Sequence, residues 1–271
     1  MTAKIYGCRG STPVSQKESR FGGNTSCITI KSDDDVLILD AGSGLTNMPK
    51  PSKDVNILIS HLHLDHIIGL SMFNPAWGKD NVANIYTCSR GDKPIREQVF
   101  GVFKPPFWPV SMEEISTANV TEITPDIPFT VGSFTITPFL ASHSDKTLAF
   151  HVTDNKKSLV YLLDCETEKM NTTERLNLKK HCTNADLVIF DATYSDEDYP
   201  RHVGWGHSTV GQGVKLAGEF SCKTMIFSHF AQHYSDTEIL NWERHFTAEG
   251  VADASGASKF ILAHDGLEIS I

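Results

Sequence analysis

The chain has no closely paired cysteines, no long apolar run and no excess of positive charge. Its 271 residues include six cysteines, and no two of them form a C-x-x-C pair, so a reducing compartment is a better match than a disulfide framework. No stretch approaches the ~18 consecutive apolar residues of a membrane span, and residues 1–6 lack the apolar core of a signal peptide. We therefore expect a cytoplasmic protein with no membrane partner.

The charge balance argues against long nucleic acid as a partner. Lys and Arg number 24 against 33 Asp and Glu, which gives a net charge of −9 with neutral histidines. A broad basic surface is not expected from this balance, although a local anion-binding pocket is compatible with it. The composition is that of a globular protein, with no low-complexity tract, repeat or linker, so we expect residues 1–271 to form one domain.

The densest chemical motif is the run His61-Leu62-His63-Leu64-Asp65-His66. It directly follows the apolar residues 55–60, which are typical of a buried strand. If the chain stays extended, His61, His63 and Asp65 share one face because side chains alternate along a strand, and His66 points into the next turn. A polar loop with clustered histidines is the alternative interpretation.

Two metal ions suit this spacing better than one. A catalytic zinc ion usually takes three protein ligands and keeps one position open. One ion bound by this run alone would crowd the backbone, whereas two ions ~3.5–4 Å apart can divide its residues. His61 and His63 would then bind one ion, and Asp65 and His66 the other. Manganese or iron would also tolerate mixed imidazole and carboxylate ligands.

Other ligand-type residues each follow a further apolar strand. The strands are expected near residues 134–140, 159–163, 187–190 and 225–228, and the residues that follow them are His143, Asp164, Asp191 and His229. Each residue alone is typical of a turn or of a satisfied polar group. Strand carboxyl ends gather on one edge of an α/β protein, so together they can complete a two-metal site. Asp40 ends the strand expected at 36–40, and we expect it to orient a ligand histidine.

The remaining patterns indicate a mixed α/β chain in which strands dominate the first two thirds. Helices are expected near residues 67–73, 93–100 and 208–220. A last helix should begin at the capping box of Ser235 and Glu238 and end at Gly250. A proline-rich loop at 104–110 carries Phe107 and Trp108, which could wall a pocket, stack on a base or belong to the core.

The ordered set His61-x-His63-x-Asp65-His66, His143, Asp164 and His229 resembles the ligand set of the metallo-β-lactamase superfamily, and the match extends over essentially the whole chain. Shorter motifs are similar to the ribonuclease Z branch and to its compact relatives, the cyclic-nucleotide phosphodiesterases that include phage anti-Pycsar proteins. These motifs lie at residues 7–13, 22–26, 191–194, 207–209 and 228–234. The resemblance implies a four-layer αβ/βα sandwich with two zinc ions on its rim.

The resemblance also implies how the ligands are shared between the ions. His61, His63 and His143 would hold one ion, Asp65, His66 and His229 would hold the other, and Asp164 would bridge them. His264 is a rival for the place of His229, and His202 and His233 remain candidate pocket residues.

Two catalytic roles follow from these assignments. Asp65 can take the proton of an attacking water. The position of His207 resembles the catalytic histidine of ribonuclease Z, with Asp191 as its carboxylate partner, and an imidazole paired in this way suits a general acid. Alternatively, His207 simply precedes a helix that Ser208 or Thr209 caps.

The space between His143 and Asp164 bears on the substrate. Ribonuclease Z enzymes insert a long basic arm there, whereas this chain has only a hairpin of strands at 147–152 and 158–163. We therefore expect a small phosphodiester, namely a 3′,5′-cyclic mononucleotide. A ribonuclease Z-like endonuclease is the nearest alternative, followed by a lactonase, thioesterase or β-lactamase on the same fold and by a non-enzymatic binding protein.

The expected substrate contacts are basic or aromatic side chains. Arg9, Arg20 and Arg201 are candidates for phosphate or base contact because guanidinium groups match phosphate oxygens, although surface ion pairs are the common alternative. Phe107 and Trp108 are the candidate stacking pair. The resemblance further implies a homodimer.

Overall fold

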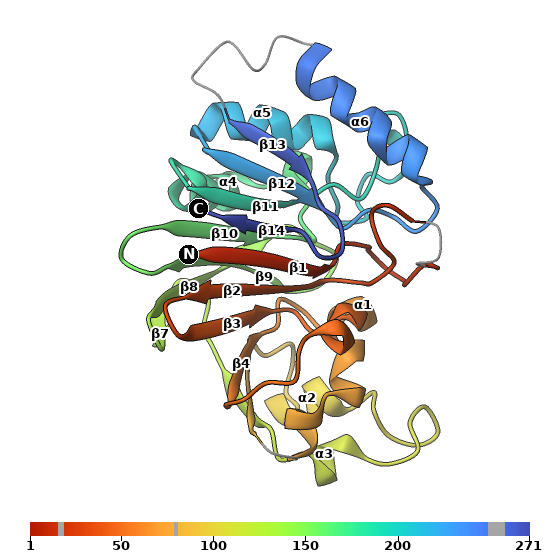
Figure 1. Cartoon of the computed structure of the whole chain (residues 1–271), viewed down its shortest axis with the longest axis vertical. Coiled ribbons are helices and arrows are strands. Elements are labelled where there is room, and N and C mark those ends of the chain that lie inside the picture. Colours follow the sequence, from red (N-terminus) through yellow and green to blue (C-terminus); the bar gives the residue numbers. More distant parts are fainter. Residues whose placement is uncertain (16–18, 79–80, 249–257) are drawn as a thin grey trace.

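The computed structural model describes residues 1–15, 19–78, 81–248 and 258–271. Within these residues two β-sheets pack face to face, and helices cover the outer side of each sheet (Figure 1). The layers are therefore helix, sheet, sheet and helix. The predicted four-layer αβ/βα sandwich is confirmed.

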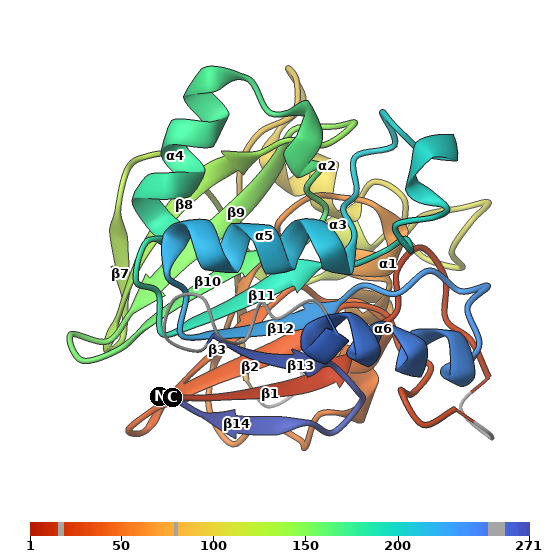
Figure 2. The ribbon, with the colours of Figure 1, turned by 90° about the horizontal axis from the view of Figure 1, so that it is seen from above.

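The first sheet takes its strands from the N-terminal half of the chain and from its last residues, in the order β14-β1-β2-β3-β4-β5-β6. Neighbouring strands are antiparallel from β14 to β3 and parallel from β3 to β6. Because β1 pairs with β14, the two ends of the chain lie side by side (Figure 2). The strands are β1 (Thr2–Gly7), β2 (Cys27–Ser32), β3 (Asp35–Leu39), β4 (Val55–Leu58), β5 (Ala83–Thr87), β6 (Asn119–Glu122) and β14 (Glu268–Ser270).

The second sheet has the matching order β13-β12-β11-β10-β9-β8-β7. Its strands are antiparallel from β7 to β10 and parallel from β10 to β13. The strands are β7 (Phe129–Val131), β8 (Phe134–Ala141), β9 (Thr147–Thr153), β10 (Ser158–Leu162), β11 (Leu187–Asp191), β12 (Thr224–Ser228) and β13 (Lys259–Leu262).

The helices divide between the two outer layers. Beside the first sheet lie α1 (Leu64–Ile67), α2 (Ile95–Phe100) and α3 (Met112–Ile115), and beside the second lie α4 (Thr172–Cys182), α5 (Val210–Phe220) and α6 (Asp236–Ala248) (Figures 1 and 2). Short 3-10 turns occupy Ser43–Asn47, Ile68–Met72, Asn74–Trp77, Thr167–Lys169 and Tyr199–Arg201. Among the described helices, none has both the length and the apolar character needed to cross a bilayer.

Alternating side chains of the strands build two apolar layers. On β3, Leu37 and Leu39 are buried against the second sheet, whereas Ile38 between them is buried beneath the helices of the first sheet. On β4, Leu58 is likewise buried against the second sheet and Ile57 beneath the helices of the first sheet. Because side chains alternate along a strand, one short apolar run serves both layers and holds the strand ends in fixed positions.

The ligand-rich motif does not stay extended, and here the sequence prediction was wrong. Strand β4 ends at Leu58, and His63 is the N-cap of α1 with β-region backbone angles. Asp65 and His66 therefore lie in the first turn of a helix. The predicted common face of His61, His63 and Asp65 is replaced by a turn that sends Asp65 and His66 toward a second group of ligands.

The helix predictions agree in part with the structure. The predicted helix at 208–220 is α5, where Thr209 accepts a hydrogen bond from the backbone of Gln212 in a full capping box. Helix α6 starts after the predicted box at Ser235, while its predicted end, Gly250, lies outside the described residues. Helix α4 was not predicted, although Asn171 and Glu174 form a further capping box at its start.

Candidate metal centre

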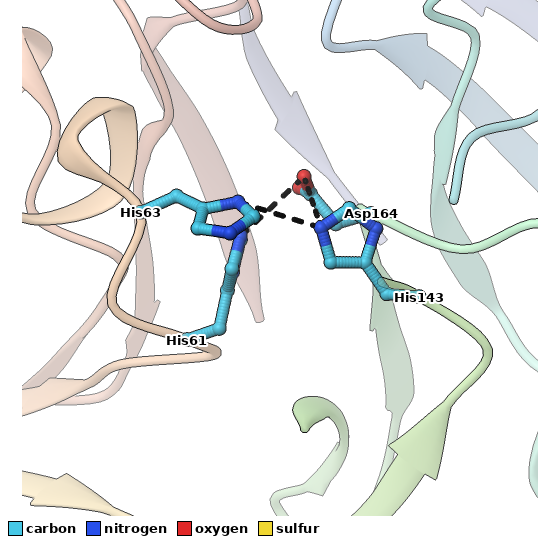
Figure 3. A group of neighbouring side chains, drawn as sticks. All are labelled: His61, His63, His143 and Asp164. Atoms are coloured by element: carbon cyan, nitrogen blue, oxygen red, sulfur yellow. Dashed lines mark hydrogen bonds and ion pairs between the residues drawn. The ribbon is translucent and has the colours of Figure 1, made fainter. Parts of the chain in front are cut away.

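The predicted ligands meet at one edge of the sandwich, where several strands end. His61 follows β4, His143 follows β8, Asp164 follows β10, and His229 follows β12. Figure 3 shows the side chains of His61, His63, His143 and Asp164 converging from these segments. The carboxyl ends of strands in both sheets therefore supply the site, as the sequence predicted.

The first group contains His61, His63, His143 and Asp164. His143 Nε2 lies 3.4 Å from His63 Nδ1 and 3.8 Å from Asp164 Oδ1. His61 Nε2 lies 3.6 Å from the same Asp164 oxygen. Three imidazole nitrogens and one carboxylate oxygen thus face a common point.

The second group contains Asp65, His66 and His229, and the second oxygen of Asp164 faces it. His66 Nε2 lies 3.2 Å from His229 Nε2 and 3.3 Å from Asp65 Oδ2. His229 Nε2 lies 3.2 Å from the same Asp65 oxygen. Asp164 Oδ2 lies 3.1 Å from His66 Nε2 and 3.4 Å from His229 Nε2.

These distances fit a metal ion. A tetrahedral ion with ligands at ~2.0–2.2 Å places its donor atoms ~3.3–3.6 Å apart, and the measured separations in the second group are 3.1–3.4 Å. Two of the converging atoms, His61 Nε2 and Asp164 Oδ2, are buried and make no hydrogen bond within the described part of the chain. Buried polar atoms without partners are costly, so a cation in each group accounts for the placement of these two atoms.

The opposite nitrogens of the histidines are held by other groups. Asp40 accepts a hydrogen bond from His66 Nδ1 at 2.6 Å, which is the contact expected of a residue that orients a ligand histidine. Asp40 also accepts from the hydroxyls of Ser60 and Tyr161, both at 2.7 Å, and Ser60 Oγ lies 3.1 Å from His61 Nδ1. Contacts of this kind fix the ring orientation and tautomer of a metal ligand.

Three of the residues that follow strands have left-handed backbone conformations. Asp40, Asp164 and His229 have φ values of 56°, 54° and 71°. This region is uncommon for residues other than glycine, and strained positions gather at functional sites. The turns aim each side chain at the centre immediately after its strand ends.

His207 and Asp191 form a buried pair beside both groups. His207 Nδ1 lies 2.8 Å from Asp191 Oδ2, and the His207 ring centroid is 5.1 Å from that of His143 and 5.2 Å from that of His229. Thr193 donates its hydroxyl to Asp191 Oδ1 at 2.7 Å and lies 2.9 Å from His229 Nδ1. The structure thus brings the two predicted catalytic residues together and links Asp191 to a candidate ligand.

The charges in this site set the protonation of its members. Burial lowers the pKa of His207, but the charge and hydrogen bond of Asp191 outweigh it and raise the pKa to about 9. Burial raises the pKa of Asp191, yet the His207 charge holds it below its usual range. Burial lowers the pKa of His61 well below its usual range, which leaves a neutral imidazole with a lone pair for a metal.

Comparison with known proteins agrees with this fold and ligand order. A family model described as a beta-lactamase superfamily domain matches residues 37–230. The chain belongs to the metallo-β-lactamase superfamily. Membership and the cluster of His and Asp side chains at this edge of the sandwich together support divalent metal ions here.

Relatives within the superfamily connect the chain to ribonuclease Z. "Ribonuclease Z 2, mitochondrial" of Schizosaccharomyces pombe is 25% identical over 262 residues, 90% of this chain but 35% of that protein. The chain thus spans about a third of that relative's length. Human tRNase Z, short form, is structurally similar with a TM-score of 0.70 at 20% identity, over 100% of this chain and 99% of that one. These similarities are consistent with the predicted relationship to the ribonuclease Z branch.

A second similar structure is described as a new diphosphatase from the PhnP family. It has a TM-score of 0.68 at 16% identity and covers 99% of this chain and 96% of its own. At such identities the two solved structures show the shared fold alone.

The position of Arg9 corrects one predicted substrate contact in this superfamily member. Arg9 is 2% exposed, and its guanidinium donates to the backbone oxygens of Gly22 and Tyr234 and to the Ser19 hydroxyl. Its Nη2 also lies 3.5 Å from Asp236 Oδ1. A guanidinium occupied in this way holds residues 19–22 against Tyr234 and is not free to bind substrate.

The other predicted contacts have different surroundings. Arg201 is exposed and lies 3.4 Å from Asp198, and Phe107 is 79% exposed. Trp108 packs edge-on against the core residue Phe103 with a centroid distance of 6.2 Å, so it suits a stacking role less well than Phe107. Arg20 donates its backbone N–H to Asp236, and its guanidinium lies over the Phe21 ring.

The rival histidines lie outside both ligand groups. His264 Nδ1 donates to the backbone oxygen of Asp265, and His202 stacks on Tyr194 with ring centroids 4.0 Å apart. His233 is exposed and packs on the neighbouring Tyr234. The preference for His229 over His264 agrees with this arrangement.

Sequence reasoning missed two residues that support the centre, Thr193 and Glu166. Thr193 belongs to the quoted motif at 191–194, but only its contact with His229 reveals a role. Glu166 lies two positions after Asp164 and is 2% exposed. No spacing rule singles out an acidic residue in that position.

Proposed function

We propose that this chain is a phosphodiesterase with two divalent metal ions that hydrolyses 3′,5′-cyclic mononucleotides to linear nucleoside monophosphates. One observation carries the proposal: a buried imidazole paired with a carboxylate, His207 with Asp191, lies against one ring of each ligand group. Such a pair supplies a proton to a leaving group, which a phosphodiester requires and simple metal binding does not.

The two ligand groups support a proposal of two metal positions. His61, His63 and His143 would hold one ion, and Asp65, His66 and His229 would hold the second, with Asp164 facing both. When bound, two such ions would lower the pKa of a water molecule toward ~7 and neutralise the phosphate oxygens of an anionic substrate. We propose zinc, for which the donor set is suited, and manganese or iron are compatible with the same donors.

The protein's own groups then move the protons. Asp65 accepts a proton from the attacking water, and its Oδ2 is positioned by the backbone N–H of Ser11 at 2.7 Å. His207 is fixed through Nδ1 by Asp191, so its Nε2 is the atom that can protonate the departing alkoxide. The attacking oxygen forms one P–O bond, the 3′ or 5′ P–O bond breaks, and His207 supplies the proton of the new hydroxyl.

The region between His143 and Asp164 supports a small substrate. Residues 144–163 form a short turn and the β9–β10 hairpin, whose strands pair in register from Ser158 with Thr153 to Tyr161 with Phe150. Long nucleic acid generally requires several phosphate contacts, and a chain with net charge −9 is poorly suited to them. A cyclic mononucleotide needs only the rim of the site.

A second candidate is RNA 3′-end cleavage by a ribonuclease Z-like endonuclease. The specific observation in its favour is that the relatives described above carry that name. Ester hydrolysis by a lactonase, thioesterase or β-lactamase would use the same fold, but that chemistry does not need the Asp191 and His207 pair.

One panel of assays separates these activities. Protein with defined metal content is tested on cyclic purine and pyrimidine nucleotides, on precursor tRNA, and on nitrocefin and an acyl-homoserine lactone. We expect linear monophosphates from the cyclic nucleotides alone. Intact cyclic nucleotides together with processed precursor tRNA would refute the proposal in favour of the endonuclease. A protein that retains no zinc, manganese or iron would instead support a binding function.

We further propose that the protein acts in the cytoplasm as a homodimer, without long nucleic acid or membrane as a partner. Six cysteines outside any C-x-x-C pair favour a reducing compartment. Light scattering at micromolar concentration tests the dimer directly, and a monomeric mass would exclude it.

A further inference from the structure

Glu166 is a buried carboxylate that takes no part in the chemistry described above. It lies two residues after Asp164 and is 2% exposed. Its Oε1 accepts hydrogen bonds from the Tyr199 hydroxyl at 2.9 Å and from the Gly204 backbone N–H at 2.7 Å. Its Oε2 accepts one from the Gly206 backbone N–H at 2.9 Å. A single carboxylate therefore holds the segment 199–206 at three points.

This segment touches a candidate metal ligand directly. The Gly206 carbonyl accepts a hydrogen bond from His143 Nδ1 at 2.8 Å. A Cβ atom at residue 206 would lie 2.1 Å from that nitrogen, and the residue has a φ of 87°, so only glycine fits against the ring. Both backbone polar groups of Gly206 are thus engaged, one by Glu166 and the other by His143.

Glu166 also holds the chain just before His143. Its backbone N–H donates to the Ser142 carbonyl at 2.7 Å. Glu166 therefore binds both the residue that precedes His143 and, through Gly206, the group that accepts from the His143 ring. Carboxylates that accept from backbone N–H groups form strong, charge-assisted hydrogen bonds, so these contacts form a stiff frame around the imidazole.

The same segment leads into the proposed proton donor. His207 follows Gly206, and the hydroxyl of the next residue, Ser208, accepts from the Thr167 backbone N–H at 3.1 Å and donates to the Cys165 carbonyl at 2.5 Å. The chain on either side of Glu166 is therefore bonded to the chain just after His207.

We propose that Glu166 is a positioning residue that holds His143, through Gly206, in place as a ligand of the first metal ion. This inference rests on the proposed two-metal site. The second ion has ligands on other segments, Asp65 and His66 on α1 and His229 after β12, so Glu166 acts selectively on one of the two ions. Removing a group that orients a ligand histidine typically lowers metal affinity by ~10–100-fold.

The variant Glu166→Gln tests the role at constant size. An amide nitrogen in place of one carboxylate oxygen faces N–H or O–H donors, so at least one of the three hydrogen bonds is lost. Glu168→Gln is the matched control, because Glu168 is two residues away and exposed. His143→Ala serves as the reference for a protein that has lost one ligand of the first ion.

The measurement is zinc titration of the metal-free full chain, followed by metal analysis after desalting. We expect two equivalents for the wild type and for Glu168→Gln. For Glu166→Gln we expect one equivalent bound as in the wild type and a second bound ~10–100-fold more weakly, as in the profile of His143→Ala.

The outcomes separate this inference from the function on which it rests. A wild type that binds fewer than two equivalents contradicts the two-metal site itself. The positioning role is overturned if Glu166→Gln binds both zinc equivalents with wild-type affinity. It is also overturned if the affinities for both equivalents fall equally. If Glu166→Gln does not fold, Glu166→Asp is measured in the same way, since its shorter carboxylate cannot keep all three hydrogen bonds to residues 199–206. The same two zinc-binding results would overturn the positioning role.

Discussion

His207 Nδ1 lies 2.8 Å from Asp191 Oδ2, and both side chains are buried. Asp191 accepts three further hydrogen bonds, from the backbone N–H groups of Cys165 and Thr193 and from the Thr193 hydroxyl. The carboxylate is therefore fixed, and its charge keeps His207 protonated at neutral pH, with a pKa raised to about 9. An imidazolium held in this way is a proton donor that is ready before the substrate arrives.

Replacing His207 with alanine should remove that donor and leave the metal ligands in place. We expect kcat on a cyclic nucleotide to fall by ~10²–10⁴-fold, the range associated with general acid catalysis, with an unchanged zinc content. Steady-state kinetics and metal analysis of the same preparation check both values. Loss of metal together with activity would show that His207 is a ligand, and its placement within 4.8 Å of ligand atoms of Asp164 and His229 makes that control necessary.

The pH dependence of kcat should depend on the same pair, His207 and Asp191. The raised pKa of His207 means that its proton is lost only as pH rises toward about 9, so kcat should fall on the basic side of the profile. Bound cations disfavour the imidazolium, so the fall should come at or below about pH 9. Asp191→Asn removes the charge that raises the pKa and should move this fall to lower pH. By linkage, the pair stabilises the fold fully below the unfolded histidine pKa of ~6.5 and loses that contribution as pH rises through about 9. A basic limb that is the same in both proteins would contradict the pairing.

The sequence predicted the centre better than the local backbone that forms it. Every ligand-type residue that follows a predicted strand lies at the same edge, because strand ends are set by apolar alternation that a sequence displays. The prediction of an extended chain from His63 to His66 was wrong because a four-residue helix has no periodicity of its own. Its start depends on tertiary contacts, such as the bond from the Ala41 backbone N–H to the His66 carbonyl.

Other features were missed because they depend on distant contacts. Helix α4 has few buried apolar residues, with Leu178 inside and Leu176 exposed, so its pattern is faint, although its capping box was visible. Arg9 has the residue type of a phosphate contact, and only the folded chain shows that Gly22 and Tyr234, from two different segments, surround it. Residue type can suggest a role, whereas burial decides whether the group is free to perform it.

Asp40 should control the second metal ion through His66. Its carboxylate accepts a hydrogen bond from His66 Nδ1 at 2.6 Å. In Asp40→Asn, an amide nitrogen that faces the His66 ring could not accept this bond. We expect a ~10–100-fold loss of affinity for one zinc ion, measured by competition with a chelator. Asp33→Asn, at an exposed turn residue with a φ of 51° that asparagine tolerates, should bind zinc as the wild type does. Equal affinities in Asp40→Asn and Asp33→Asn would rule out the orienting role.

Phe107 should contribute to substrate binding rather than to catalysis. It is 79% exposed on the loop between α2 and α3, which stands on the same side of the molecule as α1 (Figures 1 and 2). Stacking of a base on an aromatic ring contributes ~1–3 kcal/mol, so Phe107→Ala should raise KM for a cyclic nucleotide by roughly 5–150-fold with little change in kcat. Leu176→Ala, which removes another exposed apolar side chain on α4, should leave KM unchanged. Identical KM values for the two variants would place the base elsewhere.

Metal binding should release protons and should strengthen as pH rises. Burial lowers the pKa of His66, but the carboxylates of Asp164, Asp65 and Asp40 outweigh it and raise the pKa well above its usual range. The metal-free protein therefore carries a proton on His66 at neutral pH, and a metal ion must displace that proton from Nε2 because Nδ1 is bonded to Asp40. Calorimetric titration of metal-free protein with zinc in two buffers of different ionisation enthalpy measures the protons released. We expect at least one proton per protein and a tighter zinc affinity at about pH 8 than at about pH 6. Identical heats in the two buffers would mean that the histidines are already neutral, and the carboxylates around His66 would then not be acting as its charge partners.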